Sequence, residues 1–134
     1  MLTLEEYAMG RDRDYPDEWE TAKPNAINLL SLVNAFLDEL GYDAAVVSSG
    51  FRPSAINAAT PNAAKNSLHK LGKAVDIADH SGLLRKLLWI NGVSVKADLL
   101  RKYNLWMENP EWTSSWIHLD IGDRMDRTSR TFKP

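Results

Sequence analysis

The chain has 134 residues, of which 44% are hydrophobic and 25% charged, and its formal net charge is −2 at pH 7. These proportions are ordinary for a globular protein. The slightly negative charge argues against an extended basic surface that would bind nucleic acid. The absence of cysteine excludes disulfides and thiolate metal ligands, and no apolar run approaches the ~20 residues of a membrane span. We therefore expect one domain over residues 1–134 that binds no nucleic acid and inserts into no membrane.

The first 23 residues are mostly polar and come before the first long helical pattern. We expect a short helix at about Leu4 to Met9, followed by an irregular charged arm that ends near Lys23. The opening residues are acidic and lack the basic and apolar pattern of a signal peptide. We therefore expect synthesis in the cytoplasm, so that a substrate outside it would require another route of release.

From Pro24 the pattern becomes helical, because apolar residues recur at three- and four-residue spacing. Pro24 suits the first turn of this helix and Gly41 suits its C-terminal stop. The residues that carry the spacing are Ile27, Leu30, Val33, Phe36, Leu37 and Leu40. A strand at about Ala45 to Ser48 and a loop over Asn57 to Asn66 are expected next.

The middle of the chain is predicted to hold a buried strand and two helices. The strand covers Ala74 to Ala78, and the first helix, capped by Ser81, ends before the Asn91-Gly92 break. A second helix, capped by Ser94, runs to about Tyr103.

The end of the chain indicates a β-hairpin. Its arms are Leu105 to Glu108 and Ser115 to Ile121, with Asn109-Pro110 in the connection. The chain as a whole is therefore predicted to be α+β, with a small, mostly antiparallel sheet and helices packed on it.

Three side chains on this predicted framework are suitable zinc ligands. Strand alternation places His118 with Trp116 and Asp120 on one face of the last strand, opposite an apolar face. Asp76 has the same arrangement on the earlier strand, and the turn allowed by Gly72 could bring His69 over that face. Three protein ligands leave a fourth tetrahedral position for water, which is typical of catalytic zinc.

Other interpretations of these residues remain open on the spacing alone. Asp76 could be a salt-bridged core carboxylate and His118 a half-buried histidine with its hydrogen bonds satisfied. A charge in the middle of a buried strand is costly unless it is paired or metal-bound. His80 is interpreted as a solvated loop residue.

The segment Ser67-Leu-His69-Lys-Leu-Gly72-Lys-Ala74-Val-Asp76 resembles a known signature. It is similar to the Ser-x-His-x-x-Gly-x-Ala-x-Asp motif of the zinc D-Ala-D-Ala carboxypeptidases and their endopeptidase relatives, the LAS group of peptidoglycan peptidases. Ser49-Gly50-Phe51-Arg52-Pro53 resembles the Ser-Gly-Tyr-Arg element of that family, and Trp116-Ile-His118 resembles its final ligand strand. The similarity covers about residues 46–121 and implies a hedgehog/D,D-peptidase-like fold.

The resemblance also implies roles for individual residues. His69, Asp76 and His118 would bind Zn²⁺, which lowers the pKa of a bound water toward ~7 and polarises the scissile carbonyl. Arg52 would orient the substrate or stabilise the developing oxyanion. Three further residues would brace the ligands or contact the substrate: Ser67, Asp120 and Trp116.

The general base is where the chain departs from the family pattern. Ser115 stands where one branch has an acid, and Trp116 stands where another branch has a histidine. A serine cannot replace a carboxylate as a base at neutral pH. Alternation puts Glu108 on the same face of its hairpin arm as Trp106, so Glu108 is the first choice for the base and Glu111 the second.

The resemblance leads to one main functional hypothesis and two alternatives. The main hypothesis is a zinc peptidase that cuts a peptide bond in bacterial peptidoglycan stem peptides or cross-bridges, as a phage endolysin-type enzyme or a virion component. The first alternative is a catalytically inactive zinc-binding structural or wall-recognition protein on the same fold. The second is a domain without metal in which His69 and Asp76 merely pair.

Overall fold

The computed structural model describes residues 1–134. Its helices are α1 (Leu4–Ala8), α2 (Arg11–Asp14), α3 (Pro16–Leu40), α4 (Ser54–Ala59), α5 (Leu83–Leu88) and α6 (Ala97–Lys102), with 3₁₀ turns η1 (Leu68–Leu71) and η2 (Pro110–Trp112). Its strands are β1 (Val47–Ser49), β2 (Ala74–Ala78), β3 (Trp89–Ile90), β4 (Val93–Ser94), β5 (Trp106–Glu108), β6 (Trp116–Asp120) and β7 (Thr131–Phe132). None of the helices combines the length and the apolar character that crossing a membrane requires.

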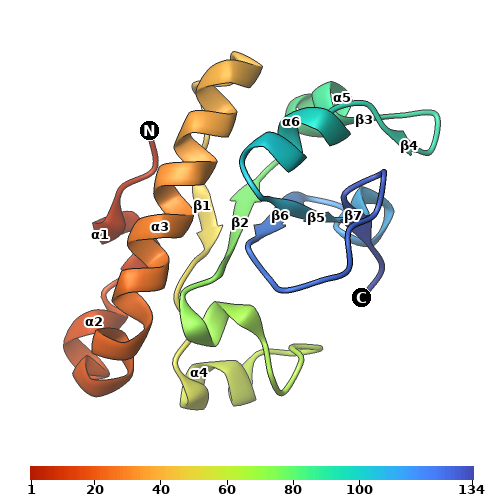
Figure 1. Ribbon diagram of the computed structural model, residues 1–134. Coiled ribbons are helices and arrows are strands. Elements are labelled where there is room, and N and C mark those ends of the chain that lie inside the picture. The colour runs from red at the N-terminus through yellow and green to blue at the C-terminus, as the bar shows by residue number, and fades with distance from the viewer.

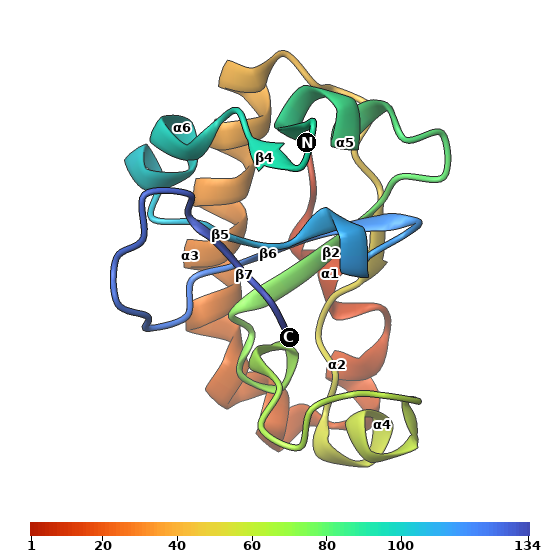
Figure 2. The same cartoon turned by 90° about the vertical axis from the view of Figure 1, so that its right-hand side faces the viewer.

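A five-stranded sheet in the order β1-β2-β6-β5-β7 forms the centre of the molecule. Neighbouring strands are antiparallel except β5 and β7, which are parallel. Helix α3 lies along one face of the sheet, and the C-terminal segment lies on the other (Figures 1 and 2). The predicted α+β class, with a small and mostly antiparallel sheet, is therefore confirmed.

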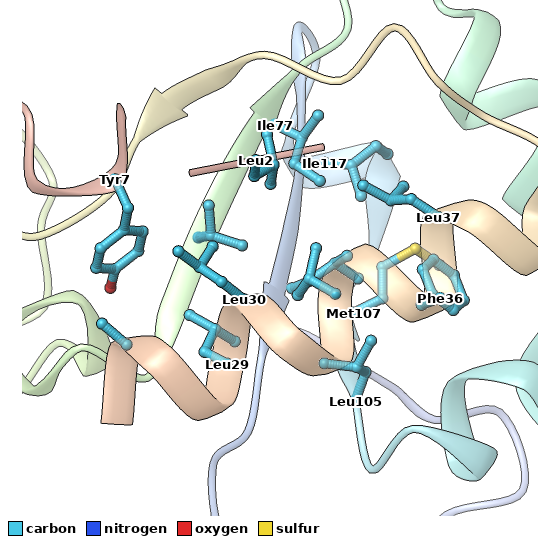
Figure 3. Packing of buried hydrophobic residues seen from close by; sticks show 14 of the residues in the cluster. Leu2, Tyr7, Leu29, Leu30, Phe36, Leu37, Ile77, Leu105, Met107 and Ile117 are labelled. Atoms are coloured by element: carbon cyan, nitrogen blue, oxygen red, sulfur yellow. The ribbon is translucent and has the colours of Figure 1, made fainter. Parts of the chain in front are cut away.

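The core lies between α3 and the sheet because each strand directs alternate apolar side chains toward the helix. Leu29, Leu30, Phe36 and Leu37 of the helix meet side chains of β2, β5 and β6 (Figure 3). The strand side chains that fill this layer are Val75, Ile77, Met107, Ile117 and Leu119, all buried. The opposite faces of the same strands carry their polar residues, together with Trp106 and Trp116.

The N-terminal prediction is wrong beyond residue 10, because α2 and the first part of α3 replace the irregular arm. Pro16 occupies the first turn of α3, and Pro24 lies inside the helix instead of beginning it. Trp19 and Ala22 are buried against the core, and this burial stabilises a helix that the polar composition hides. The expected stop at Gly41 is confirmed, with Gly41 in the left-handed conformation.

Four smaller predictions also need correction. Residues 57–59 of the expected loop belong to helix α4, and residue 94 ends strand β4 instead of capping α6, which begins at Ala97. Helix α5 is capped mainly by Asp79, whose carboxylate accepts hydrogen bonds from the backbone of Leu84 and Arg85. Ile27, expected in the core, is 53% exposed, since Ala26 and Leu29 face the sheet in its place.

Candidate metal centre

Three polar residues form a row across neighbouring strands on the sheet face away from α3. Asp76 pairs with His118 in the register of β2 and β6. Trp106 pairs with Asp120 in the register of β5 and β6, and the same register carried two residues further sets Glu108 opposite His118. Directly opposite side chains in an antiparallel pair lie about 5 Å apart at Cβ. The alternation predicted from the sequence therefore places Asp76, His118 and Glu108 side by side.

His69 reaches this row from η1, which is held close to α3. Gly72 ends η1 with φ of +74°, and a Cβ there would lie 2.4 Å from the carbonyl oxygen of Ala22. Only glycine therefore allows the turn to approach the helix so closely. As a result His69, which is buried, lies with its ring centroid 5.4 Å from that of His118.

The hydrogen bonds of His69 determine which ring nitrogen is available to a metal. Nδ1 lies 2.9 Å from the carbonyl oxygen of Gly50. Because a carbonyl only accepts, Nδ1 carries the proton and donates it. Nε2 is then unprotonated in the neutral ring and lies 3.4 Å from Oδ2 of Asp76.

His118 lies between two carboxylates. Its Nδ1 is 2.8 Å from Oδ1 of Asp76, and its Nε2 is 2.8 Å from Oδ2 of Asp120. Burial alone would lower the pKa of His118, but the hydrogen bonds to Asp120 and Asp76 outweigh it and raise the pKa to about 10. Burial would raise the pKa of Asp76, but its hydrogen bonds to His118 and His69 hold it below its usual value.

The residues fit a zinc ion by chemistry and by placement. One potential ligand atom each from His69, Asp76 and His118 lies within 4.8 Å of the others. Two imidazoles and one carboxylate are a common ligand set for catalytic zinc, which keeps one position open. Nδ1 of His118 faces Asp76, so Nδ1 is the atom that would bind the metal, and Nε2 would keep its proton for Asp120.

Arg52 and Ser67 lie beside this group. Nη2 of Arg52 donates to Oγ of Ser67 at 3.2 Å, and the same oxygen accepts from the backbone N–H of His69 at 3.2 Å. Ser67 therefore braces the start of the turn that carries His69. The pKa of Arg52 is lowered, because burial lowers it more than the negative charge of Asp76 raises it. Nε of Arg52 is buried and has no hydrogen-bond partner.

Glu108 belongs to this row on β5, whereas Glu111, the second choice for the base, lies in the 3₁₀ turn η2 outside the sheet. Glu108 is half-buried, and burial raises its pKa, with the negative charges of Asp76 and Asp120 adding to the rise and His118 opposing it. A carboxyl group with a raised pKa is better suited to accept and release protons near neutral pH. Glu111 is exposed in η2, and His80 is also exposed.

The tryptophans have different environments. Trp116 is half-buried opposite Ala78, on the same strand face as His118. Trp106 is fully buried, and Trp112 is 59% exposed.

Two residues near the centre were not anticipated from the sequence. Arg124 forms an ion pair with Asp120, and the ring of Phe132 lies edge-on to His118 with centroids 5.8 Å apart. Both come from the segment after β6, where no periodic pattern gives a signal. Phe132 reaches the site because β7 pairs with β5 in a register that joins it to Glu108.

A family model described as Peptidase M15 matches residues 3–107. The matched range includes Arg52, His69 and Asp76, and it ends before His118. No curated protein and no solved structure matches the chain.

Proposed function

Because the chain belongs to the peptidase M15 family, we propose that it is a zinc metallopeptidase that hydrolyses a peptide bond in bacterial peptidoglycan. The observation that carries the proposal is the convergence of His69, Asp76 and His118 on one sheet face, with Glu108 opposite His118. A carboxyl group beside a three-ligand zinc site can serve as the proton acceptor in a metal-activated hydrolysis.

Zinc bound by these three residues would activate a water molecule and polarise the carbonyl of the scissile bond. The Glu108 carboxylate would accept a proton from the attacking water and then donate it to the leaving amine. Its raised pKa suits both halves of that transfer. The guanidinium of Arg52, fixed by Ser67, would donate hydrogen bonds to the oxygen that gains negative charge.

The peptidoglycan substrate is proposed from the resemblance of residues 67–76 and of the flanking elements to the LAS peptidases. We favour an endopeptidase, cutting an L-Ala-D-Glu bond or a cross-bridge, over a carboxypeptidase. A phage lytic enzyme or a virion component is the setting proposed for it.

The proposal is tested by digesting purified peptidoglycan with zinc-loaded, chelated and zinc-restored protein. Mass spectrometry of the soluble products should show new amino termini that vanish with the chelator and return with zinc, and the fragment masses identify the bond. The matched variants are Glu108→Gln, which should bind zinc but turn over far more slowly, and Glu111→Gln, which should remain active. Absence of products at full zinc occupancy would refute the peptidase and favour an inactive zinc-binding protein.

A further inference from the structure

The C-terminal segment Gly122–Phe132 contacts the proposed metal centre from outside the range that the family model matches. We propose that Arg124 and Phe132 are positioning residues, which hold His118 so that its Nδ1 faces the metal and its Nε2–H faces Asp120. The inference rests on the proposed function, because it assigns these residues to the same zinc site.

The first set of contacts that holds His118 fixes the orientation of Asp120. Its side chain is completely buried and accepts hydrogen bonds through both oxygens. Arg124 donates to Oδ1 through Nη1 and to Oδ2 through Nη2, the latter at 3.1 Å. The backbone N–H of Gly122 donates to Oδ1 at 3.0 Å. A planar guanidinium that binds a carboxylate through two nitrogens fixes both the charge and the orientation of that carboxylate.

The second set of contacts is the packing of Phe132 against both His118 and Arg124. The Phe132 ring is nearly perpendicular to the His118 ring, at 83°, and Cζ of Arg124 lies 3.7 Å from the Phe132 ring centroid. The backbone carbonyl of Phe132 accepts from the N–H of Asn109 at 2.8 Å. Strand β7 therefore fixes the ring, and the ring limits the movement of the imidazole and of the guanidinium together.

These contacts have a chemical consequence for the metal site. An imidazole binds a metal through an unprotonated nitrogen, and the partner of its other nitrogen decides which one is free. Asp120 accepts the Nε2–H hydrogen bond only while its carboxylate is aimed at the ring. Loss of Arg124 would remove the two contacts that aim this carboxylate, so His118 would no longer be held in the metal-binding tautomer.

The test is the zinc affinity of the full chain, measured by competition with a chromogenic chelator. We expect Arg124→Met to weaken zinc binding by about 10–100-fold, the usual effect of removing a residue that supports a metal ligand. Arg124→Lys should recover part of the loss, because it keeps the charge without the two-pronged contact. Phe132→Leu should also weaken binding, since it removes the ring while keeping an apolar side chain.

Arg101→Met is the matched control. Nη2 of Arg101 donates to the backbone carbonyls of Arg127 and Thr128, so Arg101 holds the same segment without touching His118 or Asp120. Its zinc affinity should stay within about 2-fold of wild type. Thermal unfolding of every variant, recorded with the chelator present, shows whether the fold is kept.

A second measurement distinguishes positioning from a general structural role. Nitrogen NMR of the imidazoles in zinc-loaded protein should show His118 protonated at Nε2 in wild type and Arg101→Met, and a mixed state in Arg124→Met. Wild-type affinity in Arg124→Met, or equal losses in Arg124→Met and Arg101→Met, would overturn this inference alone. A wild-type protein that binds no zinc would overturn the proposed function and this inference together.

Discussion

Replacing Gly72 with alanine tests how closely the His69 turn must approach α3. Gly72 has φ of +74°, and an added Cβ would lie 2.4 Å from the carbonyl oxygen of Ala22, 3.1 Å from its carbonyl carbon and 3.2 Å from the amide nitrogen of Ala26. All three atoms belong to the backbone of a long helix, so none can move aside as a flexible side chain would. The turn itself would therefore have to move, and His69 would move with it.

The size of the effect follows from two costs. An alanine in the left-handed conformation costs about 1–2 kcal/mol, and an inserted carbon in a packed site costs about 1–3 kcal/mol. Together they lower the free energy of unfolding by about 2–5 kcal/mol. For a chain of this length, about 3–4 °C of Tm is lost per kcal/mol, so Tm should fall by about 6–20 °C.

Gly82→Ala is the control for this experiment, because Gly82 has φ of +75° and no atom within 4 Å of an added Cβ. It should show only the conformational cost of about 1–2 kcal/mol. Calorimetry of both variants in chelator gives the two stabilities, and a zinc titration should show weaker binding for Gly72→Ala alone. Equal stability losses in the two variants would refute the close packing of the turn against α3.

Three further predictions concern the site itself. Glu108→Gln should lower turnover by about 10²–10⁴-fold with zinc content unchanged; a loss of zinc in this variant would mean that Glu108 acts as a ligand instead. Arg52→Met should lower kcat by about 10²–10³-fold, measured on a soluble wall fragment, and Arg52→Lys should restore part of it, whereas a change confined to KM would place Arg52 in substrate binding only. In metal-free protein the raised pKa of His118, about 10 against an ordinary 6.5, stabilises the fold fully below pH 6.5 and loses this contribution as pH rises toward 10. Thermal unfolding in chelator should therefore show a lower Tm at pH 9.5 than at pH 6. An unchanged Tm would contradict a protonated His118 held between Asp76 and Asp120.

Strand alternation predicted how Asp76 and His118 of the candidate metal site lie on the sheet. The buried apolar residues at positions 75 and 77, and at 117 and 119, determine which face of each strand meets the core. Asp76 and His118 are thereby placed on the other face, and the hairpin register adds Glu108. The catalytic roles of Glu108 and Arg52 stay predictions.

The parts that were missed depend on contacts without a local pattern. The residues after α2 are helical because a few apolar side chains, such as Trp19, are buried by tertiary packing, whereas their polar neighbours suggest a loop. Phe132 reaches His118 through β7, a two-residue strand whose parallel pairing with β5 leaves no periodicity to detect. Arg124 lies in the irregular segment before β7 and binds Asp120. Such contacts become visible only when the whole sheet is assembled.

The most direct test of the zinc peptidase is a titration of metal-free protein with zinc while hydrolysis of purified peptidoglycan is followed. The account predicts that the rate of release of new amino groups rises in proportion to bound zinc and saturates at one equivalent. His118→Ala should remain at background, and His80→Ala should follow the wild type. Full zinc occupancy without hydrolysis, or hydrolysis independent of zinc, would contradict the account.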